Sequence, residues 1–138
     1  MTPLEFDPVL LTGDPDIDAQ HRELFERVGA LLDATRAHRS RDEVVRLLDF
    51  LGRYVVEHFG AEERVMQETD YERLAAHRAE HQRFVKDLGT LRRDLQTEGP
   101  STRFVMRVNA HVTEWLREHI YRADRELGEY LRARAAAR

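Results

Sequence analysis

The chain has 138 residues, among them seven His and no Cys, and its formal net charge is −4. This length is typical of one domain with a single core. The charge argues against a nucleic-acid-binding module, and the lack of Cys excludes disulfides and thiolate metal sites. Neither a bilayer-spanning apolar run nor a signal-peptide pattern is present, so we expect a cytoplasmic protein that binds neither nucleic acid nor membrane.

Long stretches without proline favour helices, since the four prolines stand at positions 3, 8, 15 and 100. Apolar residues recur there at three- and four-residue steps, and no stretch alternates with the period of a strand. We predict helices near 17–38, 41–67, 71–96 and 102–134, after a non-helical N-terminal arm over 1–16.

Residues that commonly cap helices separate these segments. The expected caps are Asp16 and Asp18, Ser40 with Glu43, Thr69 with Glu72, and the run Gly99-Pro100-Ser101. Short links between long amphipathic helices make sequential helices antiparallel neighbours. The sequence therefore predicts an all-α fold, an up-down-up-down antiparallel four-helix bundle formed by one domain over 1–138.

Seven polar residues interrupt the apolar stripes at core positions: His21, His58, Glu62, His77, His81, His119 and Asp124. Each imidazole or carboxylate facing a core costs several kcal/mol unless it is paired. At about 1.5 Å of rise per residue, counting from the helix turns places all seven in one layer, roughly 8–10 Å thick. A shared partner is needed, and this layer is predicted to be a metal site inside the bundle.

The ligand types narrow the choice of metal. Five imidazoles and two carboxylates suit Fe, Zn, Cu or Ni better than Ca or Mg. Seven ligands exceed what one ion takes, so we expect two ions bridged by Glu62 and Asp124, with three His on one and two on the other. The second ion then keeps a vacant position for a small molecule. His38 and His111 are expected to be structural or solvated.

The step from His119 to Asp124 is unusual for two residues that serve one site. Five residues turn a regular helix through about 500°, which leaves the side chains roughly 140° apart. Either the helix widens locally into a π-turn, or the two side chains approach the metals from opposite flanks of a wide stripe.

The sequence resembles the bacterial hemerythrins from about Gly13 to Leu131. The resemblance depends on an ordered set of motifs: Asp18-Ala-Gln-His21 with Leu24-Phe25, His58-Phe-Gly-Ala-Glu62-Glu63 with Met66, Tyr71, His77-x3-His81, and Trp115-Leu-Arg-Glu-His119-Ile-Tyr-Arg-Ala-Asp124. The chain departs from the family in the arm, where Phe6 stands in place of a usual tryptophan.

The resemblance implies an oxo- or hydroxo-bridged pair of Fe ions per chain. His77, His81 and His119 would hold the coordinatively full iron, and His21 and His58 the open iron. The walls of the oxygen pocket would be Phe59, Trp115, Leu116 and Ile120.

The implied function is reversible O2 binding for storage, delivery or sensing, without catalysis. The alternative is a di-iron enzyme acting on O2, peroxide or nitric oxide. Oxygen-activating bundles commonly use four carboxylates and two His, unlike the set here. Sensing would require a separate protein partner, and we expect a monomer.

Overall fold

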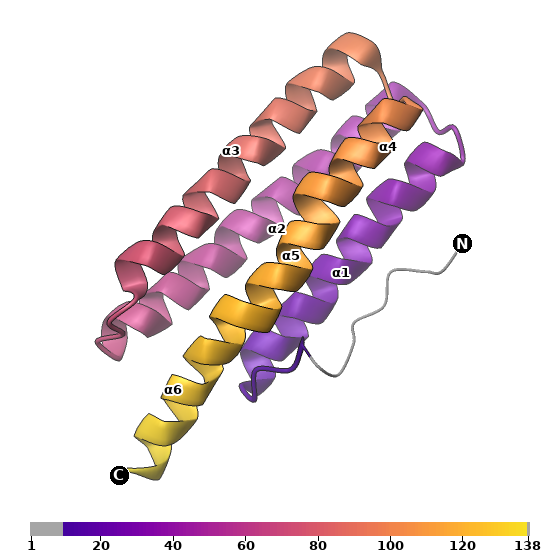
Figure 1. Ribbon diagram of the computed structural model, residues 1–138. Helices are drawn as coiled ribbons and strands as arrows, with labels where there is room; N and C mark the ends of the chain where they lie inside the picture. The colour runs from indigo at the N-terminus through magenta and orange to yellow at the C-terminus, as the bar shows by residue number, and fades with distance from the viewer. Residues whose placement is uncertain (1–9, 138) are drawn as a thin grey trace.

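The structure, a computed structural model, describes residues 10–137, and these residues contain helices and no strand (Figure 1). The first three helices are α1 (Pro15–Arg36), α2 (Arg41–Glu68) and α3 (Leu74–Glu98). A fourth, continuous helix consists of α4 (Thr102–Val108), η2 (Asn109–Thr113), α5 (Glu114–His119), η3 (Ile120–Asp124) and α6 (Arg125–Ala136). None of these helices is long and apolar enough to cross a membrane.

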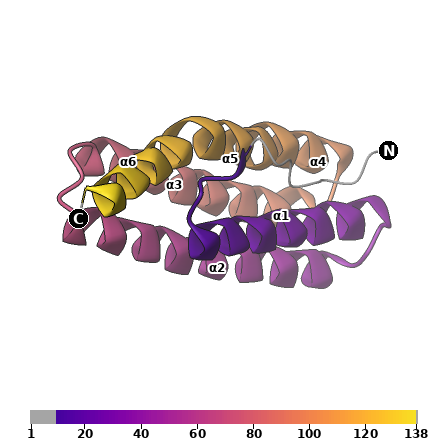
Figure 2. The same cartoon turned by 90° about the horizontal axis from the view of Figure 1, so that it is seen from below.

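The helices pack side by side as an antiparallel bundle, which confirms the predicted fold class (Figures 1 and 2). α1 contacts α2, α2 contacts α3, and the fourth helix closes the bundle by contacting both α3 and α1. The connections are short, as expected for neighbours that run in opposite directions.

Two of the four helices begin as predicted and two do not. Ser40 caps α2 by accepting a hydrogen bond from the amide of Glu43 (3.2 Å), and Ser101 caps α4 through the amide of Phe104 (3.1 Å). α1 is capped instead by Asp14, which accepts from the amides of Asp16 and Ile17, each at 3.0 Å. Asp14 takes this role because Pro15 fits the first helical position, where no amide is needed.

The start of α3 also differs from the prediction, by three residues. The hydroxyl of Thr69 does not cap α3; it donates to the carbonyl of Val65 (2.8 Å), in the last turn of α2. Tyr71 is buried at this end of the bundle, and α3 begins only at Leu74 without a side-chain cap. Burial of the Tyr71 ring therefore overrides the local capping signal.

The core consists of apolar clusters with a polar layer between them. The largest cluster fills the half of the bundle that contains the α1–α2 and α3–α4 connections, and includes Leu24, Val55, Phe84 and Leu116. A smaller cluster at the opposite end includes Ile17, Met66, Tyr71 and Leu127. The seven predicted polar residues lie between these two clusters along every helix.

The described part of the N-terminal arm is attached to α1 and α6. The buried carboxylate of Asp18 accepts hydrogen bonds from the amide and the hydroxyl of Thr12, both at 2.8 Å. Arg132 donates to the carbonyl of Thr12. The same carbonyl lies so close to Gly128 that a Cβ built there would overlap it. Phe6 lies outside the described residues.

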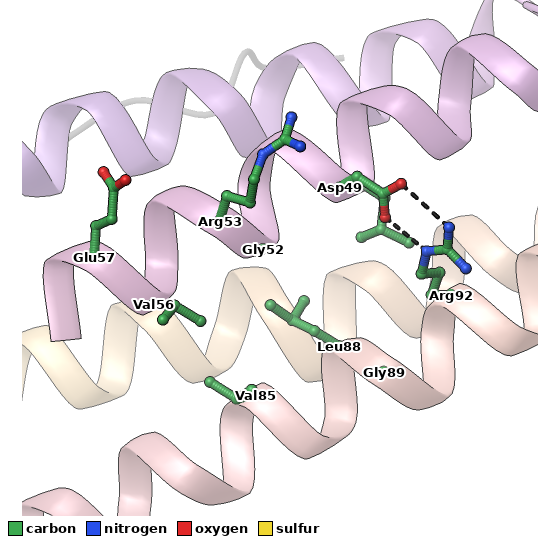
Figure 3. Close-up of a pocket in the computed structure, with 10 residues that line it drawn as sticks. Asp49, Gly52, Arg53, Val56, Glu57, Val85, Leu88, Gly89 and Arg92 are labelled. Carbon is green, nitrogen blue, oxygen red and sulfur yellow. Dashed lines mark hydrogen bonds and ion pairs between the residues drawn. The ribbon is translucent and has the colours of Figure 1, made fainter. Parts of the chain in front are cut away.

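A surface groove of about 580 Å³ runs between α2 and α3 (Figure 3). Gly52 and Gly89 contribute no side chain to it, and Val56 and Val85 line it at one end. At the other end Arg92 donates to both carboxylate oxygens of Asp49, at 2.7 and 3.3 Å. This ion pair joins α2 and α3 about 14 Å along α2 from His58, well away from the polar layer.

Substitution of Gly128 by Ala is expected to destabilise the protein by about 1–3 kcal/mol, because the new methyl group overlaps the Thr12 carbonyl. The measurement is the free energy of unfolding in denaturant. Gly29→Ala is the matched control, since a Cβ at that helical glycine meets nothing within 4 Å. The control should gain about 0.5–1 kcal/mol. Equal stability of the two variants would contradict the close approach of the arm to α6.

Candidate metal centre

The polar layer brings all seven predicted site residues together. Their donor atoms form two groups in which all atoms lie within 4.8 Å of one another. One group contains three imidazoles and the other two, and both contain Glu62 and Asp124; the members are Glu62, His77, His81, His119 and Asp124, and His21, His58, Glu62 and Asp124. Every member is buried.

The carboxylate of Glu62 faces both groups, one oxygen to each. Its Oε1 lies 2.8 Å from His77 Nε2 and 3.4 Å from His81 Nε2. Its Oε2 lies 2.8 Å from His58 Nε2 and 3.5 Å from His21 Nε2. His58 and Glu62 are one helical turn apart on α2, and His77 and His81 are one turn apart on α3, so each pair shares a helix face.

Asp124 divides its oxygens in the same way. Oδ1 lies 3.0 Å from His77 Nε2 and 3.4 Å from His119 Nε2, whereas Oδ2 lies 3.2 Å from His21 Nε2. Two carboxylates thus stand between three imidazoles on one side and two on the other. This is the donor arrangement that suits two bridged cations.

A π-turn explains how His119 and Asp124 serve one site. η3 spans Ile120–Asp124, and the amide of Arg125 donates to the carbonyl of Ile120, five residues earlier. Such a turn contains an extra residue, so side chains five apart come round to the same side of the helix. Of the two arrangements predicted for this step, the local widening is the one observed. The second π-turn, η2 at Asn109–Thr113, has no counterpart in the prediction.

Several donor atoms inside the layer have no hydrogen-bond partner in the described part of the chain. They are buried and face the shared centre: Nε2 of His21, His81 and His119, Oε2 of Glu62, and both carboxylate oxygens of Asp124. Buried polar atoms in folded proteins are normally satisfied. Nitrogen and oxygen donors left open at one point fit a pair of first-row transition metals such as iron.

Three residues outside the predicted set contact the outward nitrogens of these rings. His58 Nδ1 donates to Gln20 Oε1 (2.6 Å), and His81 Nδ1 donates to Glu63 Oε2 (3.1 Å). Glu80 Oε1 lies 3.8 Å from His119 Nδ1. Gln20 and Glu80 went unnoticed because they lie outside the apolar stripes, although each sits one residue from a predicted ligand.

The four predicted pocket walls lie against this layer or close to it. The ring of Phe59 stacks on His81 at 3.8 Å between centroids, and Trp115 stacks on His119 at 4.4 Å. Leu116 is part of the largest apolar cluster, and Ile120 packs with Leu10 and Phe25. His38 and His111 belong to neither donor group; both are exposed.

Mutual charge pairing shifts the ionisation of the buried groups. Burial disfavours charged imidazoles, but the close contacts with the negatively charged Asp124 and Glu62 outweigh it, raising the pKa of His21 to about 9 and that of His77 to about 10. Burial acts to raise the pKa of Glu62 and Asp124 as well, yet the surrounding imidazoles hold both pKa values below their ordinary range. Without metal, the layer therefore retains protons on imidazoles and charge on carboxylates.

The metal-free protein is expected to be most stable between about pH 5 and 6.5. The raised pKa values of His21 and His77 add stability that is complete below their ordinary 6.5 and is lost as the pH rises through 9 to 10. The lowered pKa values of Glu62 and Asp124 add stability that is lost as the pH falls below their ordinary values of 4.5 and 3.8. Denaturant unfolding across this pH range is the measurement.

The metal-loaded protein is the control, because metal-bound imidazoles carry no extra proton and the alkaline decline should shrink. A metal-free protein whose stability stays constant or rises from about pH 7 to 10 would contradict the charge pairing.

Comparison with known proteins agrees with the fold and with the arrangement of buried donors. The sequence model of the family described as "Hemerythrin HHE cation binding domain" matches residues 12–131. A bacteriohemerythrin from Methylococcus capsulatus is 36% identical over 121 residues, covering 84% of this chain and 86% of that protein. A hemerythrin-like protein from Naegleria gruberi is 32% identical over 124 residues, covering 89% of each chain.

A solved crystal structure, that of a leucine-to-phenylalanine mutant, superposes with a TM-score of 0.81. It is 30% identical in sequence, and the match covers 94% of this chain and 97% of that one. Fold, sequence and the arrangement of buried donors agree, and this chain belongs to the hemerythrin family.

Proposed function

We propose that this protein holds two iron ions in the polar layer and binds O2 reversibly. The observation that carries the proposal is the division of donors by Glu62 and Asp124, each with one oxygen toward three imidazoles and the other toward two. The family membership supports iron as the metal.

Each residue has a role in this proposal. Glu62 and Asp124 would be shared by the two irons, and His77, His81 and His119 would complete the ligands of one of them. His21 and His58 would hold the other iron with one imidazole fewer, which would leave a position for a small molecule. When bound, the iron pair supplies the electrons that O2 accepts on binding and gives back on release.

The surroundings of the two donor groups favour reversible O2 binding because they keep water away from the site. The two donor groups are buried, and apolar side chains lie on both sides of the layer. We assign Phe59, Trp115, Leu116 and Ile120 as the walls that keep water from the open position. Five imidazoles with two carboxylates also differ from the four carboxylates and two imidazoles common in oxygen-activating di-iron bundles.

An anaerobic titration tests the proposal directly. Protein reconstituted with ferrous iron should contain two irons per chain, one for each donor group. Addition of O2 should produce charge-transfer absorption bands that disappear when O2 is removed under argon. A single iron per chain, or a site that accepts only zinc, would overturn the proposal. Continuous O2 consumption with oxidation of an added reductant would favour a di-iron oxidase instead.

Replacement of a histidine on the two-imidazole side should affect iron and O2 together. In His58→Ala the smaller group loses one of its two nitrogens, so we expect about one iron per chain and loss of the O2-dependent bands. Metal analysis after reconstitution measures this. His111→Ala is the matched control, since His111 is exposed and outside both groups, and it should keep the full iron content. Unchanged iron content in His58→Ala would exclude His58 as a ligand.

A further inference from the structure

The outward nitrogens of the layer's imidazoles have different partners on its two sides. On the three-imidazole side, His81 Nδ1 donates to the carboxylate of Glu63 at 3.1 Å. The other oxygen of that carboxylate accepts a hydrogen bond from Arg78 Nε at 2.8 Å. Arg78 lies one turn before His81 on α3, so α2 and α3 together fix the carboxylate behind the ring.

A second pair of charged residues lies behind His119. Glu80 Oε1 accepts a hydrogen bond from Arg122 Nη2 at 2.6 Å and lies 3.8 Å from His119 Nδ1. The Arg122 guanidinium thus pairs with the Glu80 carboxylate and holds it near the His119 ring. Two of the three imidazoles on this side therefore have an anion behind them, held in place by an arginine.

On the two-imidazole side, no such anion lies behind the rings among the residues that the structure describes. His58 Nδ1 donates to Gln20 Oε1 at 2.6 Å, and this amide carries no charge. His21 Nδ1 and His119 Nδ1 both have no hydrogen-bond partner among residues 10–137, but His119 Nδ1 has the Glu80 carboxylate 3.8 Å away, whereas His21 Nδ1 forms no ion pair in this range. The two sides thus differ in the charge behind their rings as well as in the number of nitrogens.

We infer that Glu63 is a positioning residue that strengthens His81 as a metal ligand, that the nearby charge of Glu80 acts on His119 in the same direction, and that the three-imidazole site is therefore the tighter of the two. This inference rests on the metal centre of the proposed function. A carboxylate that accepts from Nδ1–H fixes the ring orientation, leaves the Nε2 lone pair free, and raises the basicity of the ring. A more basic ring donates more electron density, which stabilises the higher oxidation state of a bound iron. A neutral amide partner raises the basicity of the ring less than a carboxylate does.

The experiment titrates metal-free protein with Co²⁺ in competition with a chelator. The parent should bind two ions in two separate phases, a tight one followed by a weaker one. In Glu63→Gln the tight phase should weaken by about 10–100-fold while the weak phase stays in place, and Glu80→Gln should act in the same direction but less, given its longer contact. In Gln20→Leu the affinity of the weak phase should change instead, while that of the tight phase stays as in the parent.

Asp49→Asn is the matched control. It also removes a carboxylate charge from an α2–α3 ion pair, but in the distant groove, so both phases should stay as in the parent (Figure 3). The reduction potential of the iron-loaded protein provides a readout that a merely structural role would not move: it should rise in Glu63→Gln and stay constant in Asp49→Asn.

The outcomes separate the two proposals. Absence of cobalt binding to the parent would overturn both the metal centre and this inference. Two bound ions whose tight phase and potential are unaffected by Glu63→Gln would overturn this inference alone, and so would equal weakening of both phases. If Glu63→Gln does not fold, Arg78→Gln applies the same test, since it removes the arginine that holds Glu63 in place behind His81 without altering the carboxylate.

Discussion

The structure depends on one constraint, which is that seven polar side chains must be buried in a single layer of a small helical bundle. Spread through the core, each would carry the cost of an unpaired buried polar group. Gathered between two apolar clusters, they compensate one another through close imidazole–carboxylate pairs. Donors that remain unpaired at the centre then supply the driving force for binding metal, so stability and function draw on the same groups.

This constraint made much of the site predictable from the sequence. The rise of a helix is fixed, and short connections align the helices, so counting residues from the turns placed His21, His58 and Asp124 at one height. The π-turn followed as one of two solutions, because a five-residue step cannot bring His119 and Asp124 to the same side of a regular helix. Periodicity and spacing therefore define the layer without knowledge of the contacts.

Other features depend on tertiary contacts that the sequence does not encode locally. Thr69 has the sequence pattern of a cap for α3, but α3 begins only after the buried Tyr71, and the Thr69 hydroxyl donates a hydrogen bond within α2 instead. Nothing in the residues Asn109–Thr113 indicates η2. Gln20 and Glu80 look like ordinary surface residues, and only the packing of neighbouring helices brings them to the outward nitrogens of His58 and His119. Such contacts between helices determine which side chains lie next to the outward nitrogens of the layer.

The π-turn at Ile120–Asp124 has a consequence for how this chain tolerates changes in length. The π-turn absorbs one extra residue locally, so the residues that follow keep the rotation they would have in a regular helix one residue shorter. Deleting one residue between His119 and Asp124 would restore a regular helix in which these two are four residues apart, and it would leave Asp124 in the layer, Leu127 in its apolar cluster and Gly128 facing Thr12. In a regular stretch of helix the same deletion would rotate everything that follows by about 100°. The middle of this helix thus tolerates a change in length that regular helices, unlike loops, do not absorb.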